Sequence, residues 1–333
     1  MPQVSIVTPV FNEALNLAEL AKRIIAVGRA LDSHHIALEV VLVDDHSHDA
    51  TPEIAKAAFR DQGFSFTYVR LSRNSGSHTA IAAGLQHCTG DCAIIMAADL
   101  QDPPELIPRL LERWQARNDV VWAGRTAREG ESWTTRSTSR IYYWLMRLLA
   151  LPDMPKKGAD VMLLDRKVID AYNAIREKHT SLLAMILWLG FRQTSIEYVK
   201  QARHAGKSKW TLSKKLKLVV DSIVSFSYVP IRAMSLLGGG MALCGFGYAT
   251  AILVGRVCGW VLAGTGFAAL MTVLLIGQGS ILLMLGILGE YLWRTYDEAR
   301  GRPRYIVEEY VTSDRQAIAA GTPVKTPPGG SNL

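Results

Sequence analysis

Two long stretches without a charged residue constrain most strongly what this chain folds into. They cover residues 233–255 and 257–289, and Arg256 alone separates them. Each stretch is long enough to cross about 30 Å of hydrocarbon as a helix. The pattern therefore predicts a two-helix transmembrane hairpin over residues 233–293. The alternative is a buried hydrophobic hairpin in a soluble protein.

The charges that flank this hairpin predict its orientation. Positive residues stay on the cytoplasmic side of a membrane protein. Both flanks are basic, so we expect the N-terminal domain and both termini to lie in the cytoplasm. The flanking basic residues are Lys200, Arg203, Lys207, Lys209, Lys214, Lys215, Lys217 and Arg232 before the hairpin, and Arg294, Arg300, Arg302 and Arg304 after it.

The net charge of the chain limits its partners. A formal charge of +7 indicates an anionic partner, which is nucleic acid, a phosphate-bearing substrate or a membrane surface. The basic residues cluster beside the predicted spans, which disfavours nucleic acid. The four cysteines are too few for a disulfide framework, and no His/Cys group completes a zinc set.

The first half of the chain alternates apolar runs with helical patterns. Alternation of this kind predicts a Rossmann-like α/β domain, in which a mostly parallel sheet is covered by helices on both faces. The predicted strands cover residues 4–11, 38–45, 66–72, 92–99 and 119–125, and the predicted helices cover residues 13–31, 52–60, 78–87 and 104–117.

Polar residues follow every predicted strand. In sheets of this type, ligands bind beyond the carboxyl ends of the strands. We therefore expect these residues to converge on one polar site. They are Asn12 and Glu13, Asp44 and Asp45, Arg73 and Asn74, the run from Asp99 to Asp102, and Arg125.

These residue types suit a phosphate-bearing nucleotide. Asp44 and Asp45 can accept hydrogen bonds from ribose hydroxyls or a base N–H. Asp99, Gln101 and Asp102 supply hard oxygen ligands for Mg²⁺ or Mn²⁺. No Walker lysine loop and no Gly-x-Gly-x-x-Gly follow the first strand, so ATPase and dinucleotide functions lose support. The cations available for phosphate oxygens are Arg73, Arg125, Arg128 and the basic segment 202–210.

Eight segments, in order along the chain, carry a resemblance to a known family. The chain resembles the bacterial polyprenyl-phosphate glycosyltransferases of glycosyltransferase family 2, which are related to dolichyl-phosphate mannose synthase. The match runs from about residue 4 to residue 310. Its segments are SIVTPVFNE, VVLVDDHSHDAT, LSRNSGSHTAIAAGL, ADLQDPPELIPRLL, RTAREGES, RHAGKSKW, SFSYVPIR and GEYLWRTYDEARGRPRYIVEE.

The resemblance implies a GT-A fold and transfer of one sugar from a nucleotide sugar to undecaprenyl phosphate, with inversion, in the bacterial inner (plasma) membrane. A UDP-sugar is favoured as donor, and UDP-glucose is the single best prediction. The implied product is a lipid-linked sugar for modification of cell-envelope glycans. A homo-oligomer, a flippase and a downstream glycosyltransferase are further partners compatible with this assignment.

The resemblance also implies roles for individual residues. Asp160 stays open between orienting the sugar, acting as a base and capping a helix. Asp102 stays an alternative metal ligand. The implied donor-binding residues are Pro9, Glu13, Asp44, Asp45, Arg73, Asp99 and Gln101; the catalytic residues are Asp99, Asp160, Arg125 and Arg128; the acceptor-phosphate residues are Arg203, Lys207, Ser208 and Lys209; and the metal ligands are Asp99 and Gln101.

One position departs from the family pattern. The family usually has Asp-x-Asp before Leu-Gln, but Ala97 stands where the first acid is expected. Either Asp99, Gln101 and the donor diphosphate suffice for the metal, or the metal is bound weakly and cations do more of the work. A catalytically silent scaffold or lipid-phosphate binder is the alternative function.

Four parts are expected along the chain. A GT-A domain covers residues 1–210, an amphipathic juxtamembrane helix covers 211–232, the hairpin covers 233–293, and a cytoplasmic C-terminal segment covers 294–333, disordered from about residue 313. The segment 139–151 mixes aromatic and leucine residues with arginines, and is predicted to lie on the membrane surface as a second amphipathic helix.

Overall fold

The structure is a computed structural model, and it describes residues 1–60, 62–128, 159–175, 177–178, 181–201, 229–258 and 266–313. These residues divide into two compact units. One unit combines residues before position 222 with residues after position 300, and the other lies within residues 222–300. The predicted amphipathic segment 139–151 and most of the predicted segment 211–232 lie outside the described residues.

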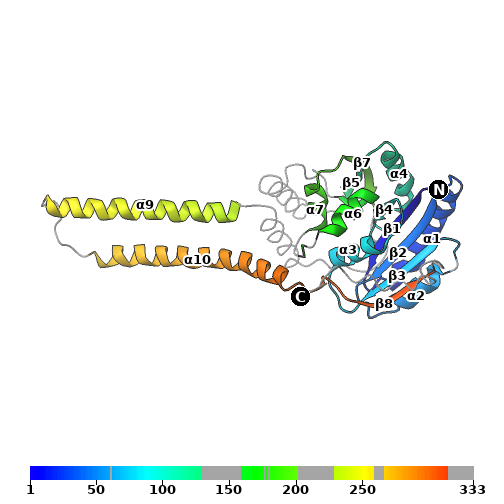
Figure 1. Cartoon of the computed structure of the whole chain (residues 1–333), viewed down its shortest axis with the longest axis horizontal. Coiled ribbons are helices and arrows are strands. Elements are labelled where there is room, and N and C mark those ends of the chain that lie inside the picture. The colour runs from blue at the N-terminus through cyan, green and yellow to red at the C-terminus, as the bar shows by residue number, and fades with distance from the viewer. Residues whose placement is uncertain are drawn as a thin grey trace. The chain divides into compact units, whose positions relative to one another are not determined.

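The first unit is built on one sheet (Figure 1). Its described strands follow the order β7-β5-β6-β4-β1-β2-β3-β8. β4, β1, β2 and β3 pair in parallel, as do β5 and β7, whereas β6 is antiparallel to both its neighbours and β8 is antiparallel to β3. The strands are β1 (Gln3–Val10), β2 (Ala37–Asp44), β3 (Ser65–Leu71), β4 (Cys92–Ile95), β5 (Val120–Arg128), β6 (Ala159–Asp165), β7 (Gln193–Lys200) and β8 (Val307–Thr312).

Helices connect the strands of this sheet. Parallel neighbours need a crossover connection, and helices supply it between β1, β2, β3 and β4. The helices are α1 (Ala14–Asp32), α2 (Thr51–Phe59), α3 (Ser77–His87), the 3₁₀ turn η1 (Pro104–Leu106), α4 (Ile107–Gln115), α6 (Arg166–Ala174) and α7 (Leu182–Trp188).

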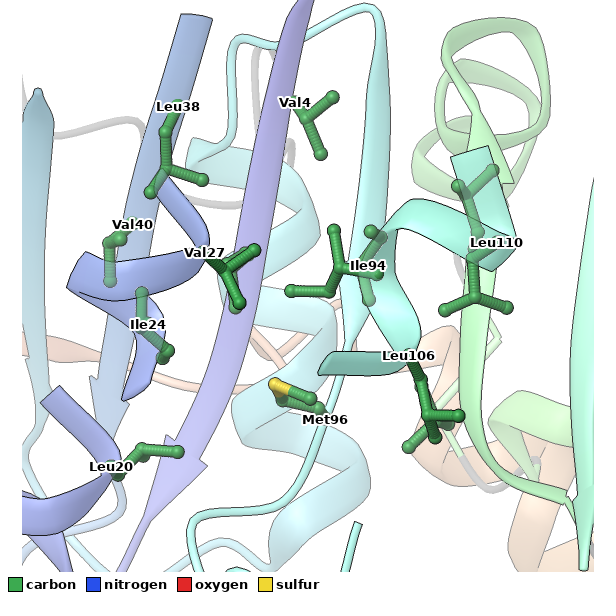
Figure 2. Packing of buried hydrophobic residues seen from close by; sticks show 14 of the residues in the cluster. Val4, Leu20, Ile24, Val27, Leu38, Val40, Ile94, Met96, Leu106 and Leu110 are labelled. Carbon is green, nitrogen blue, oxygen red and sulfur yellow. The ribbon is translucent and has the colours of Figure 1, made fainter. Parts of the chain in front are cut away.

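The two faces of the central strands are covered by different helices. Val4, Leu38 and Val40 share one face with the apolar side of α1, as Figure 2 shows. Val7 points the other way, because successive side chains alternate across a strand, and it meets α3. Complete burial of each such side chain contributes about 1.5–3 kcal/mol. This two-sided burial explains why β1 and β2 are almost continuously apolar.

α3 lies unusually close to β1 at one glycine. A Cβ atom added at Gly84 would lie 2.3 Å from Val7 Cγ1 and 3.2 Å from Val43 Cγ2. No real side chain fits in that space without moving its neighbours. Gly84 therefore sets how near the helix approaches the sheet, and it fixes the height of the α3 N-terminus relative to the ends of β1 and β2.

The five predicted strands and the four predicted helices are all present, with ends shifted by a few residues. The largest shift is in β4, which ends at Ile95, although Met96 N still donates to Val7 O at 3.1 Å. Residues from Ala97 onward leave the sheet and form the polar turn. β6, β7 and β8 were not predicted. Polar and charged residues interrupt β7 and β8, so neither forms a continuous apolar run.

The second unit consists of α9 (Val229–Val257) and α10 (Phe267–Ala299). Both helices are long and apolar enough to cross a membrane, over Ile231–Ile252 and Ile276–Ala299. Their apolar side chains are exposed, and Leu236 reaches 78%. An apolar surface of this extent fits lipid rather than water. At the end of α10, the Arg300 guanidinium lies 5.3 Å from the ring centre of Tyr296, an arrangement common at membrane interfaces.

Candidate active site

The parallel register brings the ends of three strands to one edge of the sheet. Val10 of β1 pairs with Asp44 of β2, and Asp44 pairs with Arg70 of β3. β4 continues the row, since its last residue pairs with Val7. The residues that follow these strands therefore lie along a common edge, as the sequence predicted.

The backbone turns sharply at this edge. Asn12, His46 and Leu100 follow β1, β2 and β4, and their φ angles are 50°, 65° and 59°. Residues other than glycine adopt this left-handed region at a cost of about 1–3 kcal/mol each. Such strain persists only where surrounding bonds fix it, and it concentrates at functional sites.

Hydrogen bonds join the turn after β1 to the loop after β2. Asn12 N donates to Ser47 Oγ at 2.9 Å, and His48 N donates to Asn12 Oδ1 at 2.8 Å. Glu13 N donates to Thr51 Oγ1 at 2.9 Å. The two turns therefore form one bonded unit at the start of α1 and α2.

Asp44 lies beneath this unit and is fully buried. Its Oδ1 accepts from Ser47 N at 2.8 Å, while its Oδ2 accepts from the Tyr68 hydroxyl at 2.8 Å and pairs with Arg70 at 3.0 Å. Burial, together with the hydrogen bond to Asp44, raises the pKa of Tyr68. The buried Asp44 carboxylate thus holds the loop after β2 and two side chains of β3 in place, below the surface of this edge.

Asp45 fixes the start of α3. Its two carboxylate oxygens accept from Ser75 N at 2.6 Å and from Gly76 N at 2.8 Å. Gly76 has a φ of 91°, which a residue with a side chain adopts with strain. Asp45 is only 4% exposed. It therefore links the end of β2 to the loop that precedes α3.

Other predicted donor-binding residues lie nearer the surface of the same edge. Pro9 is half-buried near the end of β1. Glu13 is half-buried at the start of α1, and its Oε2 accepts from Asn16 Nδ2 at 2.7 Å. Arg73 is exposed, two residues beyond β3. These placements bring the three residues to the predicted region of the site.

The turn after β4 separates Asp99 from Asp102. Asp99 is half-buried, and its Oδ1 accepts from Gln101 N at 3.2 Å. Asp102 is fully buried, accepts a hydrogen bond from the Tyr198 hydroxyl, and lies 3.5 Å from Lys200 Nζ. Asp102 therefore forms a buried ion pair, and its role as an alternative metal ligand stays a prediction.

β5, β6 and β7 extend this edge. Arg125 pairs with Tyr198 and Arg128 with Lys200, so both arginines lie at the carboxyl end of β5. Asp160 follows Ala159, which pairs with Gly124 at the start of the antiparallel β6. The backbone thus brings Arg125, Arg128 and Asp160 to the edge that carries Asp99. The predicted acceptor residues Arg203, Lys207, Ser208 and Lys209 lie outside the described residues.

Two charged residues at this edge escaped the sequence analysis. Arg70 lies in β3, where the surrounding run is apolar, and Glu308 lies in the unpredicted strand β8. Their side chains are joined by a hydrogen bond of 3.0 Å from Arg70 Nε to Glu308 Oε2. A lone arginine inside an apolar strand was the available signal, since a buried charge requires partners.

Comparison with known proteins decides the family. The family model described as Glycosyl transferase family 2 matches residues 5–172, which cover β2 to β6, most of β1 and the turns that follow β1, β2, β3 and β4. The chain belongs to glycosyl transferase family 2. This confirms the family that the motifs predicted, and with the sheet and the two apolar helices it confirms a GT-A enzyme fold followed by two candidate spans.

Several known proteins are similar to the chain over almost their whole length. The chain is 37% identical over 310 residues to the uncharacterized glycosyltransferase YkcC of Bacillus subtilis (92% of this chain, 94% of the relative). It is 39% identical over 318 residues to the undecaprenyl-phosphate 4-deoxy-4-formamido-L-arabinose transferase of Pseudomonas paraeruginosa (95% and 92%). The transferase of the same name from Edwardsiella ictaluri is 38% identical over 315 residues (94% and 95%).

The solved structures that match are less similar in sequence. One is glucosyl-3-phosphoglycerate synthase from Mycobacterium tuberculosis in complex with Mn²⁺, UDP-glucose and phosphoglyceric acid. It is 15% identical, the match covers 67% of this chain and 78% of that one, and the TM-score is 0.49.

Proposed function

We propose that this glycosyltransferase transfers one sugar from a nucleotide sugar to a polyprenyl phosphate at a membrane surface. The observation that carries the proposal is the joining of two features in one chain. A family 2 domain gathers carboxylates and arginines at one sheet edge, and two apolar helices follow it. Relatives of 38–39% identity that match more than 90% of the chain act, by name, on undecaprenyl phosphate.

The donor binds along the ends of β1 to β4 in this proposal. Pro9, Glu13 and Arg73 lie at the surface and contact the nucleotide. Asp44 and Asp45 act mainly from below, because their oxygens hold the loops at residues 47 and 75–76. The nucleotide therefore meets a surface that buried carboxylates keep in shape.

A divalent ion fits the turn after β4. Asp99 and Gln101 offer hard oxygen donors of the kind that Mg²⁺ and Mn²⁺ prefer. Within the described residues, no three His, Cys, Asp or Glu side chains form a metal-binding group by themselves. With Ala97 in place of an acid, we propose that Asp99, Gln101 and the donor diphosphate hold the ion together. When bound, the ion neutralises charge on the leaving nucleoside diphosphate.

The acceptor needs little activation. A phosphate monoester has a second pKa of about 6, so its oxygen is largely anionic at neutral pH. The main task of the protein is to bring two anions together and to stabilise the departing diphosphate. Arg125 and Arg128 lie at the correct edge for this task. We propose direct displacement at the anomeric carbon with inversion. The role of Asp160 stays open between orienting the sugar, acting as a base and capping a helix.

The lipid acceptor explains the apolar helices. Its tail is confined to the bilayer, and its phosphate lies at the level of the headgroups. In this proposal α9 and α10 cross the inner membrane, both ends of the chain are cytoplasmic, and Arg203, Lys207, Ser208 and Lys209 bind the lipid phosphate. The excess of basic residues on both flanks supports this orientation.

The donor sugar is the open choice within this function. UDP-glucose is the donor that the sequence analysis predicted. The names of the relatives add a nucleotide-activated 4-deoxy-4-formamido-L-arabinose as its rival. Both donors therefore belong in the first experiment.

The test is transfer by the purified full chain to a short-chain polyprenyl phosphate. The donors are radiolabelled UDP- and GDP-sugars together with the formamido-arabinose donor, with Mg²⁺, with Mn²⁺ and with EDTA. We expect a lipid-linked sugar from one donor and its loss in EDTA. Product that persists in EDTA would assign the charge stabilisation to the cations. Folded protein that forms no product from any donor would support the silent scaffold or lipid-phosphate binder.

Two matched variants localise the activity. Asp99→Asn removes the proposed metal-binding charge, and we expect transfer to fall at least about 100-fold, the order seen when an electrostatic group is removed. Asp91→Asn makes the same change at the other end of β4, where Asp91 is exposed and accepts from Gln3 N at 2.8 Å. It should retain transfer within about twofold. Equal losses in the two variants would remove Asp99 from the site.

A further inference from the structure

The strand that follows α10 brings a carboxylate to the donor edge. β8 pairs with β3, and Glu309 lies opposite Arg70 in the register. The neighbouring Glu308 accepts from Arg70 Nε at 3.0 Å, and its Oε2 also lies 3.3 Å from His46 Nδ1. Glu308 therefore touches both β3 and the left-handed residue that follows β2.

Arg70 also contacts two buried residues of the donor edge. Its NH1 pairs with Asp44 Oδ2 at 3.0 Å, and its NH2 donates to Ser47 O at 3.1 Å. All three guanidinium nitrogens of Arg70 therefore have a hydrogen-bond partner. Glu308 is the exposed partner, and Asp44 and Ser47 are the buried ones. The hydrogen bond from Arg70 lowers the pKa of Glu308.

The inner end of the network is the bonded pair of turns. Ser47 receives Arg70 on its carbonyl, donates its N–H to Asp44, and accepts from Asn12 N on its hydroxyl. Asn12 in turn accepts from His48 N. Asn12 and His46 both hold left-handed backbone angles, so the network fixes two strained residues at once.

We infer that Glu308 is a positioning residue for the donor site: through Arg70 it holds the turns after β1 and β2 in the shape that binds the nucleotide. The inference rests on the proposed function for its consequence in catalysis. Glu308 comes nine residues after Ala299, the last residue of α10. The strand that follows α10 in the sequence, β8, therefore carries the residue that contacts the turns after β1 and β2.

The chain offers a matched control beside Glu308. Glu309 is the next residue of the same strand and also forms an ion pair, with Lys56 Nζ of α2 at 2.8 and 3.1 Å. Lys56 lies in α2, where its Nζ also lies 5.1 Å from the ring centre of Tyr68. Glu308→Ala removes the contacts with Arg70 and His46, and Glu309→Ala removes the ion pair with Lys56. Only the first change should disturb the loops that bind the nucleotide.

The experiment combines two measurements on the purified full chain. Amide hydrogen exchange reports the N–H groups of Asn12, Ser47 and His48, whose bonds depend on the network. We expect Glu308→Ala to speed their exchange about tenfold or more and to raise the donor KM about tenfold, with kcat changed less than about twofold. Glu309→Ala should leave both near wild type. Glu308→Gln should restore most of the KM, since its amide oxygen still accepts from Arg70.

Each outcome decides the inference. Unchanged exchange at Asn12, Ser47 and His48 in Glu308→Ala overturns it, as does an equal change in Glu309→Ala. A wild-type chain that transfers no sugar contradicts the proposed function instead, and the exchange measurement then still decides whether Glu308 holds the two turns. A fall in kcat with unchanged KM would place Glu308 outside donor positioning.

Discussion

Asp45 accepts two backbone N–H groups, one on each carboxylate oxygen, and this count makes Asp45→Asn a sharp test. Asparagine is nearly the same size but offers one oxygen. Its NH₂ group would face the N–H of Ser75 or Gly76, so two hydrogen-bond donors would face each other with no acceptor between them. The side chain is 4% exposed, and water cannot easily replace the lost acceptor.

The expected cost follows from these contacts. A hydrogen bond to a charged group contributes about 1.5–3 kcal/mol, and one of the two is lost. We expect Asp45→Asn to be destabilised by about 2 kcal/mol. At about 2–4 °C per kcal/mol for a domain of this size, the melting temperature should fall by about 4–8 °C.

The assay is thermal unfolding of the detergent-solubilised chain, followed by intrinsic fluorescence. Asp91→Asn is the matched control, because the Asp91 carboxylate accepts the single N–H of Gln3, which one asparagine oxygen can still serve. It should cost less than about 0.5 kcal/mol. A melting temperature of Asp45→Asn within 1 °C of wild type, or an equal fall in both variants, would refute the two-bond argument; the 1 °C limit is roughly a quarter of the smallest expected shift.

Two further predictions concern packing and pH. Gly84→Ala places a methyl group 2.3 Å from Val7 Cγ1, so overpacking should outweigh the helix-propensity gain and cost about 2 kcal/mol, and an unchanged melting temperature would show that Val7 moves aside. Burial, with the charge of Arg304, lowers the pKa of His78 to about 4. Above the unfolded pKa near 6.5, His78 is neutral in both the folded and the unfolded state. As the pH falls toward 4, the unfolded state binds a proton first, and the folded state loses up to about 3 kcal/mol of stability. His78→Gln should therefore flatten the fall in melting temperature between pH 7 and 4.5, and equal falls in both proteins would contradict the assignment.

The central strands were predictable because each one is a short apolar run that can be recognised from its own residues. β1 and β2 are buried on both faces, so most of their residues are apolar, and polar residues mark the end of each strand. β7 and β8 carry no such signal. β8 contains Glu308 and Glu309, whose charges are paired with Arg70 and Lys56 from distant parts of the sequence.

The location of the site was predictable from the sequence, but the separate roles of its carboxylates were not. Sequence reasoning brought Asp44, Asp45, Asp99 and Asp102 to one edge, because the carboxyl ends of parallel strands meet there. It could not separate surface from interior. That distinction depends on Tyr68, Lys200 and Tyr198, whose side chains reach Asp44 and Asp102 from other strands.

The antiparallel pairing of β8 with β3 has a consequence for how the protein is made. Translation produces β3 early and β8 near the end, with both apolar helices in between. Until residues 307–312 emerge, the outer edge of β3 has unpaired N–H and C=O groups, and open edges of this kind promote aggregation. The newly made domain must therefore wait for the helices to be synthesised before its sheet closes. Synthesis of the two apolar helices and completion of the sheet are thus ordered steps of one biosynthetic sequence.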